Sequence, residues 1–471
     1  MIFTQPIFFA FFALTFGVHW ALRGERARKL WLLAMSYVFY GYWDYRFVGL
    51  IVLCTVFDFG VGLLLARTDD QRRRRALIAA SLCMNLGLLG FFKYYGFFVS
   101  SAEELLSGLG LAVSVPLLKV VLPAGISFFT FQTMSYTIDV YRRQLEPQRN
   151  FLDFAVFVGF FPQLVSGPIV RATQFLPQLT VPRVLANVDV RRALVLFAVG
   201  YFKKACVADH IAAAIDPVFA HPSQFDAIAR SLSALLYSIQ IYCDFSGYTD
   251  MALGAAALLG YDLAVNFEAP YFSTSLREFW QRWHISLSTW LRDYLYIPLG
   301  GNRGGPYRAA RNLMLTMLLG GLWHGANWTF ILWGFLHGAA LVVHRFWVSF
   351  RARRTPSASA SPAVEVLCWL GTFAWVVLCF TIFRCQNIGI AREFLAPLGA
   401  PSSELPPSLD WCAVVLVLAA AHWVIFRHKA VLKSRIASTT DWVFYPALGV
   451  AASLLLSLTP AKAAPFIYFQ F

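Results

Sequence analysis

The stretch VGLIVLCTVFDFGVGLLL, residues Val48–Leu65, decides the class of fold of this 471-residue chain. Asp58 is its one charged residue, and a helix of about 20 apolar residues is long enough to cross a bilayer. Comparable apolar runs recur on both sides of it, at Ile7–Leu22, Ala76–Val99, Trp328–Phe346, Val364–Phe383, Trp411–Phe426 and Val443–Leu458. Repeated runs of this length predict a chain that crosses the membrane many times.

The composition agrees with a membrane protein. Hydrophobic residues make up 58% of the chain and charged residues only 14%, whereas a soluble domain is about a quarter charged. Two further runs are weaker: Leu194–Ala208 is interrupted by Lys203 and Lys204, and Ala309–Leu322 carries Arg311. Together these patterns predict an all-α polytopic membrane protein of roughly ten to twelve membrane-embedded helices.

The formal net charge of +14 is concentrated in alternate loops. Basic groups lie at Arg23–Lys29, Arg67–Arg75, Arg142–Arg149, Arg351–Arg354 and Arg427–Arg435. Cytoplasmic loops carry such an excess of Lys and Arg, so we expect these loops inside and both chain ends outside. Nucleic-acid binding is an unnecessary explanation of this charge. The first apolar run lacks a basic start, which indicates a retained span rather than a signal peptide.

Residues 1–350 are expected to form the membrane core, with N-terminal spans in 1–140. A cytoplasmic linker at 351–362 includes the small and polar run Thr355–Pro362. Residues 363–471 then form C-terminal membrane helices and an aromatic tail. Inside the core, Phe160–Pro168 contains two prolines and a glycine, which break a straight helix. A re-entrant segment lining a cavity and a kinked ordinary span both remain open. The eight cysteines show no paired spacing, and we expect neither disulfides nor a metal site.

His324 is the first candidate for chemistry. It lies in Gly320–Trp328, between two long apolar runs, and an ionisable residue at that depth is a functional candidate by default. Imidazole titrates near neutrality, which suits a general base. We expect the neighbouring glycines to let a substrate approach, Trp323 and Trp328 to form apolar walls, and Asn327 to orient the ring or the acceptor. A buried histidine satisfied by a nearby carbonyl remains an equal alternative from these residues alone.

His284 is the second candidate. The segment Phe279–Leu295 is expected to form one amphipathic helix at the membrane surface. On it, one face would be shared by His284, Leu287, Ser288, Leu291 and Leu295. An interfacial histidine without a role is the alternative. Since 324 − 284 is 40, only folding can bring the two histidines together.

Two polar segments flank these histidines. Pro298–Gly305 is a glycine-rich loop with Asn302 and Arg303, and with Arg282 it is a candidate site for the phosphates of an anionic cofactor. The positive-inside bias explains its charge equally well. Further upstream, Asp244 and Asp250 stand beside a long apolar run. The simplest explanation is that these carboxylates cap a helix. The more specific alternative is that they line a polar cavity.

Taken in order, several segments resemble the membrane-bound O-acyltransferase family, in particular the branch that acetylates bacterial polysaccharides such as alginate. They are Phe160–Pro168, Asp244–Asp250, Asn266–Tyr271, Arg282–Ser288, Pro298–Asn302, Gly321–Asn327 and Phe466–Phe471. The resemblance implies helices around a central tunnel. His324 matches the key histidine of the family, and His284 matches its second histidine.

The resemblance also implies an activity. Acetyl would come from cytoplasmic acetyl-CoA, with no metal, and would cross the inner membrane to O-acetylate an extracytoplasmic polysaccharide. An alginate-like exopolysaccharide, peptidoglycan and cellulose all remain open as acceptors. Tyr468, in the aromatic tail, is a possible acyl relay to an extracytoplasmic SGNH-type acetyltransferase partner, although an interfacial anchor explains the tail as well.

Two other classes of function remain open at this point. A transporter or flippase of a polysaccharide export system would use the broken helices and histidines as a proton-coupled path. A non-catalytic scaffold for a polysaccharide synthase would tolerate substitution of both histidines.

Overall fold

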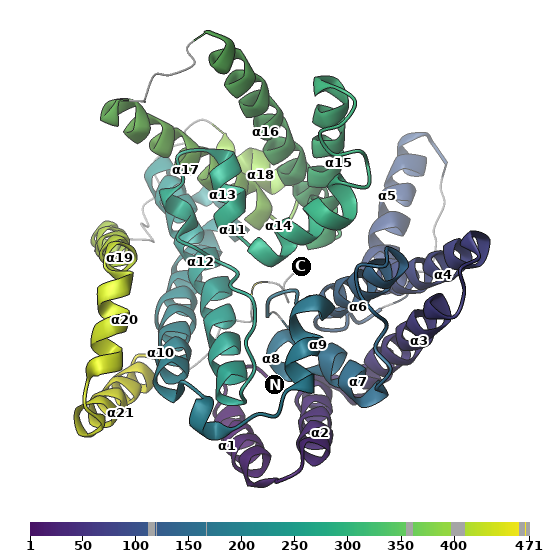
Figure 1. The fold of residues 1–471 in the computed structure, drawn as a ribbon. Helices are drawn as coiled ribbons and strands as arrows, with labels where there is room; N and C mark the ends of the chain where they lie inside the picture. The colour runs from purple at the N-terminus through teal and green to yellow at the C-terminus, as the bar shows by residue number, and fades with distance from the viewer. Residues whose placement is uncertain are drawn as a thin grey trace. The chain divides into compact units, whose positions relative to one another are not determined.

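The computed structural model describes residues 1–111, 118, 120–165, 167–354, 361–396, 410–460 and 467. These residues form helices and connecting loops without a strand (Figure 1). They group into two units, one of residues 1–193 with 252–264 and one of residues 194–251 with 265–471. The predicted all-α class is therefore confirmed. Residues 355–360, which are half of the linker predicted at 351–362, and residues 397–409 lie outside the described residues.

Among the described residues, nine α-helices lie within the first unit. They are α1 Pro6–Ala21, α2 Glu25–Asp44, α3 Val48–Ala66, α4 Gln71–Leu89, α5 Tyr95–Gly108, α6 Ile126–Tyr141, α7 Phe151–Gly159, α8 Phe161–Leu164 and α9 Ala172–Thr180. Helices α10 (Val190–Tyr201) and α12 (Ala227–Leu258) each have residues in both units. The second unit adds α11 Asp209–Ala220, α13 Leu276–Arg282, α14 Ile285–Leu291, α15 Pro306–His324, α16 Trp328–Arg354, α17 Pro362–Arg384, α18 Ile388–Leu395, α19 Asp410–Arg427, α20 Lys429–Ser438 and α21 Asp441–Ser457.

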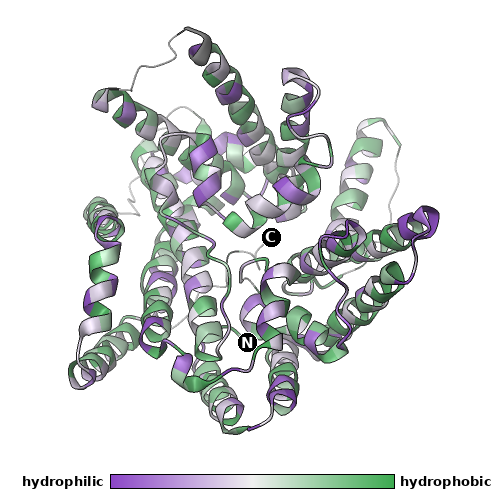
Figure 2. Cartoon of the chain, in the orientation of Figure 1, coloured by the Kyte–Doolittle hydropathy of each residue, from purple (hydrophilic) through white to green (hydrophobic). Residues whose placement is uncertain are grey.

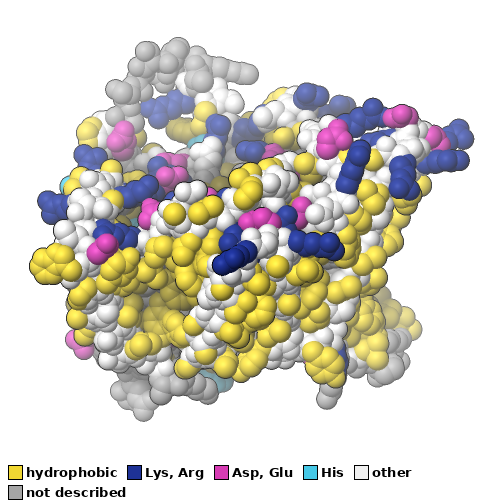
Figure 3. Space-filling view, turned by 60° about the horizontal axis from the view of Figure 1, so that its bottom comes forward, with side chains coloured by type: hydrophobic (Ala, Val, Ile, Leu, Met, Phe, Trp, Pro, Cys, Tyr) yellow, Lys and Arg dark blue, Asp and Glu magenta, His cyan; other side chains and the backbone are white. Residues whose placement is uncertain are grey.

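Five helical segments of the described chain are long and apolar enough to cross a membrane. They are Glu25–Ala66, Gln71–Gly108, Trp328–Arg351, Pro362–Arg384 and Asp410–Arg427, and the bent pair α20 and α21 would make a sixth. Large apolar side chains on these segments face outward, as Leu416 and Val417 do on α19, which are 69% and 66% exposed. Figure 2 shows the apolar character of the helices, and much of the surface in Figure 3 is hydrophobic. The chain is a multi-pass membrane protein, but the predicted total of ten to twelve embedded helices is not confirmed.

A buried polar cluster joins three helices of the first unit around Asp58. Its carboxylate accepts hydrogen bonds from Ser81 Oγ at 2.6 Å and from Asn85 Nδ2 at 2.8 Å, and Thr133 Oγ1 donates to Asn85 Oδ1 at 3.0 Å. All four side chains are buried. The charged residue that interrupts the Val48–Leu65 run is therefore satisfied by α4 and α6, which fixes how the three helices pack.

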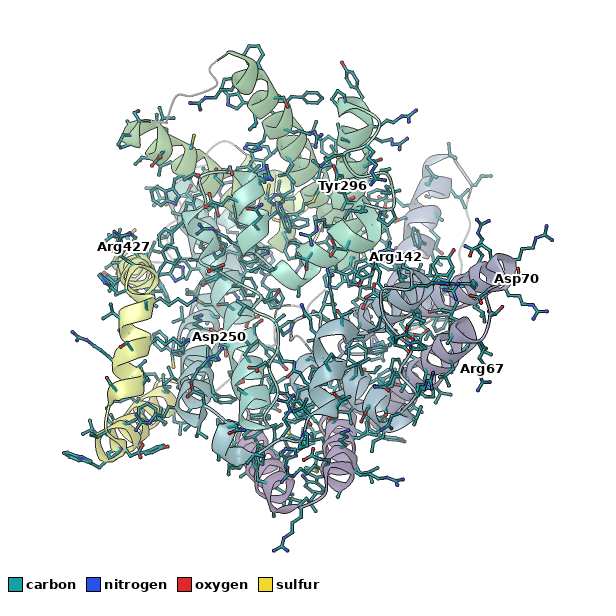
Figure 4. All side chains as sticks on the ribbon, viewed as in Figure 1. Arg67, Asp70, Arg142, Asp250, Tyr296 and Arg427 are labelled. Atoms are coloured by element: carbon teal, nitrogen blue, oxygen red, sulfur yellow. The ribbon has the colours of Figure 1, made fainter. Side chains whose placement is uncertain are left out.

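Two basic loops of the first unit contact each other. Arg143 pairs with Asp69 at 2.5 Å, and Arg74 donates to the carbonyl of Tyr141 at 2.7 Å, so the loop after α3 meets the loop after α6. Arg67, Asp70 and Arg142 mark this place in Figure 4. The two loops that the charge pattern assigns to the cytoplasm are thus neighbours, as a single cytoplasmic face requires.

The segment Phe160–Pro168 is broken, as its prolines predict. Helix α7 ends at Gly159, α8 is a single turn, and residues 168–171 are not helical. The freed backbone is satisfied by buried side chains, since Phe161 N donates to Ser36 Oγ at 3.1 Å and Gln132 Nε2 donates to the Phe157 carbonyl at 2.6 Å. The break is therefore buried in protein, the setting in which irregular backbone is tolerated.

In the second unit, α15 and α16 pack side by side (Figure 1). Their backbones approach closely because glycines face the partner helix. A Cβ built on Gly321 would lie 2.3 Å from the Phe330 carbonyl oxygen, and one on Gly334 would lie 2.4 Å from that of Met317. This contact carries His324, the last residue of α15, into the interior of the unit.

Candidate functional site

The site begins with a break in the polypeptide at His284. The single amphipathic helix predicted for Phe279–Leu295 is wrong, because α13 ends at Arg282 and α14 starts at Ile285. His284 stands between them in the left-handed region, with φ of 42°. Such a backbone is uncommon for residues other than glycine, and it occurs at sites that the surrounding structure over-determines.

Asn266 stabilises the break through hydrogen bonds to both its backbone and its side chain. Its carbonyl oxygen accepts from Ile285 N at 2.9 Å, and its Oδ1 accepts from Ser286 N at 3.1 Å and from Ser286 Oγ at 2.9 Å. The amide therefore caps α14 from a loop that precedes it by about twenty residues in sequence. Asn266 and His284 are both fully buried, and the cap stabilises the backbone from which the imidazole projects.

The two histidines meet. The ring centroids of His284 and His324 are 6.3 Å apart, and the Trp323 ring lies 6.0 Å from His284 and 5.2 Å from His324. On the other side of His284, the Phe245 ring lies 4.7 Å away and nearly perpendicular. Burial lowers the pKa of His284 to about 3, so this imidazole is neutral at neutral pH.

His324 is 4% exposed and is surrounded by aromatic rings. Trp333 lies 5.0 Å from it and Phe383 5.3 Å, both edge-on. The expected wall at Trp323 is present. The expected wall at Trp328 is wrong, because that side chain is 52% exposed, and Trp333, five residues further along α16, lies against the ring instead.

The glycines beside His324 do not leave room for a substrate, contrary to the expectation. A Cβ on Gly325 would lie 2.1 Å from the Phe330 ring, and the space beside Gly321 is filled by the Phe330 backbone. These glycines bring α15 and α16 together. Any approach of a reactant to His324 must use another side of the ring.

The supporting residues fix the local backbone. Asn327 Nδ2 donates to the Gln386 carbonyl at 2.5 Å, and its Oδ1 accepts from Thr329 N at 3.0 Å at the start of α16. Ser288 Oγ donates to the Trp283 carbonyl at 3.1 Å. Asn327 thus ties the turn after His324 to the end of α17, and Ser288 ties α14 to the break at His284.

One residue of this cluster escaped the sequence analysis. His337 is fully buried on α16, with Trp333 at 4.8 Å and Trp280 at 5.2 Å between ring centroids. A lone histidine in an apolar run does not by itself indicate a function. Its spacing of four residues from Trp333 did predict that the two side chains share one face of the helix.

A second buried cluster lies on α12. Helix capping by Asp244 or Asp250 is wrong, because both are interior residues of that helix. Asp250, labelled in Figure 4, pairs with Lys203 at 2.6 Å, and Asp244 pairs with Lys204 at 2.5 Å. Lys204 also pairs with Asp209 at 2.7 Å. The lysines that interrupt the Leu194–Ala208 run are therefore the partners of the carboxylates.

The same cluster holds one residue of the C-terminal tail. The backbone N–H of Ile467 donates to Asp244 Oδ2 at 2.9 Å, and Ile467 is 2% exposed. Asp244 precedes Phe245, the residue against His284. Tyr468 lies outside the described residues.

The predicted cofactor residues are placed as follows. Arg282 pairs with Glu278 at 2.7 Å, and Asn302 Oδ1 accepts from Tyr296 OH at 2.8 Å and from Arg345 Nη1 at 2.6 Å. Arg303 is exposed in a turn where Gly300, Gly301 and Gly304 all have positive φ. Within the described residues, no group of three or more His, Cys, Asp or Glu is arranged to hold a metal ion.

Comparison with known proteins shows the family of this chain and several relatives. The model of the membrane-bound O-acyltransferase family matches residues 142–384, the range that contains both histidines. The chain is 43% identical to the probable alginate O-acetylase AlgI of Pseudomonas aeruginosa over 83% of its own length and 73% of that protein. It is 36% identical to a peptidoglycan O-acetyltransferase of Helicobacter pylori over 84% of its length and 79% of that protein. A teichoic acid D-alanyltransferase of Streptococcus thermophilus is 29% identical over 55% of the chain and 67% of that protein.

Proposed function

Because this chain belongs to the membrane-bound O-acyltransferase family and is a membrane-bound acyltransferase, we propose that it carries acetyl from cytoplasmic acetyl-CoA across the bacterial inner membrane for O-acetylation of an extracytoplasmic polysaccharide. The observation that carries the proposal is the meeting of His284 and His324. Their rings lie 6.3 Å apart in a buried aromatic setting, although 40 residues separate them in sequence.

His324 is the proposed general base. It takes the proton of the acceptor hydroxyl as the hydroxyl oxygen attacks the thioester carbonyl, and a C–O bond forms. The C–S bond then breaks, and the imidazolium returns the proton to the leaving thiolate. A base of this kind contributes about 10²–10⁴-fold, and holding both reactants in place contributes up to about 7–11 kcal/mol.

His284 is proposed to act beside it as a neutral imidazole, because its depressed pKa keeps it uncharged. A neutral ring next to His324 does not repel the positive charge that His324 gains when it takes up the proton. Trp323 contacts both rings and holds their spacing.

The donor is proposed to bind from the cytoplasmic side through the glycine-rich loop. Arg303 is exposed there, and the positive φ values of its glycines give the loop a compact turn. Arg345 donates to Asn302, and the Arg308 side chain lies against Gly304, so two further cationic groups stand beside the same loop. Arg282 is a weaker contributor, because Glu278 neutralises it.

Tyr468 is the proposed acyl relay towards an extracytoplasmic SGNH-type acetyltransferase. The support is the anchoring of Ile467, whose amide binds Asp244, next in sequence to a residue that contacts His284. The chain continues directly from that anchor to Tyr468. In this proposal the Tyr468 phenol accepts acetyl as an ester and delivers it outside.

The acceptor class follows the names of the relatives. Alginate O-acetylases and a peptidoglycan O-acetyltransferase are similar over most of the chain. We therefore propose a polysaccharide hydroxyl, with an alginate-like exopolysaccharide as the first polymer to test.

The experiment combines two readouts on matched variants. His324→Ala and Tyr468→Phe should abolish polymer O-acetylation, measured by mass spectrometry of exopolysaccharide and cell-wall fractions. The control His221→Ala changes an exposed histidine and should leave it intact. Purified wild-type protein should consume acetyl-CoA, and the His324→Ala protein should not. Normal acetylation in a correctly inserted His324→Ala protein would contradict the proposal, and a transporter would show no thioester consumption in any variant.

A further inference from the structure

Three polar rings lie together next to His324. The centroids of Trp280 and Trp333 are 5.6 Å apart, those of Trp280 and His337 5.2 Å, and those of Trp333 and His337 4.8 Å. The Trp333 ring is also 5.0 Å from His324. The residues come from α13 and α16, so the cluster forms only in the folded protein.

Each of the three rings has at least one buried nitrogen that has no hydrogen-bond partner among the described residues. They are Nε1 of Trp280, Nε1 of Trp333 and both ring nitrogens of His337. Trp333 is 2% exposed and His337 is fully buried. An unmet buried donor costs about 1–3 kcal/mol, and native proteins keep few of them. Three such groups in mutual contact indicate a partner that the polypeptide does not supply.

The chemistry of the rings defines that partner. An indole N–H donates and does not accept, and an imidazole donates through the nitrogen that carries its proton. With His337 neutral, three of the four unmet nitrogens are donors and one accepts, so the missing partner must above all present an acceptor, as a carbonyl oxygen does. Acyl transfer creates such an acceptor, because the thioester carbonyl oxygen gains negative charge when the tetrahedral intermediate forms, and buried donors aimed at that oxygen stabilise it.

We propose that Trp280, Trp333 and His337 form the oxyanion-binding subsite of this acyltransferase, and the proposal rests on the proposed function of His324. The acceptor oxygen bonds to the thioester carbon, and the carbonyl π electrons move onto the oxygen held by the two indoles and His337. His324 takes the hydroxyl proton. When the carbonyl re-forms, the C–S bond breaks, and the proton passes from His324 to sulfur. No metal or redox partner is needed.

Two other accounts of the cluster lead to different outcomes. A permanently bound water would satisfy the same donors without entering the reaction. Aromatic packing alone would make the ring shapes important and the N–H groups irrelevant. An experiment must therefore remove a donor while it keeps the shape of the ring.

The sharpest variant replaces Trp333 with β-(3-benzothienyl)alanine, in which sulfur stands where the indole has N–H. We expect kcat to fall by about 10²–10³-fold, the loss found when one oxyanion donor is removed, with KM for acetyl-CoA unchanged. The same replacement at Trp280 should act in the same direction. The matched control is this replacement at Trp328, an exposed tryptophan near the start of the same helix, which should leave kcat unchanged.

A folded benzothienyl variant at position 333 that keeps the wild-type kcat would overturn the subsite. A structure of the wild-type protein with acetonyl-CoA, a non-transferable ketone analogue, is the second measurement. The ketone oxygen should lie within hydrogen-bond distance of the Trp333 or Trp280 nitrogen, and a retained water there would contradict the proposal. A wild-type protein that neither consumes acetyl-CoA nor binds the analogue would contradict the proposed function, which distinguishes the two failures.

Discussion

At the scale of single residues, His284 has two separable roles, one in its backbone and one in its ring. Its φ of 42° is favourable for glycine and tolerable for asparagine, but it costs about 1 kcal/mol for alanine. Ring and backbone must therefore be tested with different substitutions.

We expect His284→Asn and His284→Gly to be more stable than His284→Ala, because asparagine and glycine adopt the left-handed conformation at lower cost than alanine. All three should lose acetyl transfer, since none has an imidazole. Thermal unfolding in detergent measures the first effect, and acetyl-CoA consumption measures the second. An alanine variant as stable as the glycine variant would show that the backbone is not strained.

The same imidazole gives a pH prediction. Its pKa is about 3 in the folded protein and near 6.5 when unfolded. The unfolded state alone binds this proton between those values, so stability falls as the pH drops below about 6.5. From pH 6.5 to 4.5 the contribution is about 2–3 kcal/mol. We expect the acid loss of thermal stability to be smaller in His284→Asn than in the wild type, and equal slopes in the two proteins would contradict a buried neutral ring.

At the scale of secondary-structure elements, the α15–α16 contact depends on glycines rather than on apolar area alone. Gly321 faces the backbone of Phe330 at a distance that excludes a Cβ. Backbone cannot rotate away as a side chain does, so a methyl group at this position must separate the helices.

Gly321→Ala should therefore destabilise the protein by about 1–3 kcal/mol, the usual cost of overpacking, and displace His324 enough to reduce turnover. Gly371→Ala is the matched control, since this α17 glycine has no atom within 4 Å of a built Cβ and alanine favours helix. Detergent unfolding and acetyl-CoA consumption report both effects. Equal behaviour of the two variants would show that α15 and α16 can separate without harm.

The break between α13 and α14 shows where element prediction failed and why. The apolar spacing from Phe279 to Leu295 is compatible with one helix, and nothing local stops it. The stop comes from Asn266, whose three hydrogen bonds to Ile285 and Ser286 start a new helix. A tertiary cap outweighs periodicity here, and the spacing of residues does not reveal which distant amide will provide it.

At the scale of the whole molecule, the membrane class was predictable because long apolar runs have few alternatives to a spanning helix. The motifs singled out His284 and His324 as candidate catalytic residues, and the structure brings their rings together. Their contact was not derivable from spacing, since it depends on how α14 and α15 fold together. One further contact could have been predicted. Two lysines in one apolar segment and two aspartates in another indicated ion pairs between the segments, Lys203 with Asp250 and Lys204 with Asp244.

That pairing can be tested by exchange. Lys203→Asp should strongly destabilise the protein, because it leaves two carboxylates in a largely buried site, where breaking a pair costs about 3–5 kcal/mol. Lys203→Asp combined with Asp250→Lys should recover much of the membrane level, measured by immunoblot of membrane fractions. If the double variant reaches no higher membrane level than Lys203→Asp alone, the two charges act separately.

The Lys–Asp pairs also constrain how the protein is made. Lys203 and Lys204 reach the ribosomal exit about 40 residues before Asp244 and Asp250, and each would be costly alone in an apolar interior. The segment that carries the lysines must therefore remain near water, or beside a polar insertion factor, until α12 is synthesised. In nascent chains halted near residue 250, Lys203 should react with a membrane-impermeant amine reagent, whereas in chains halted beyond residue 290 it should be protected.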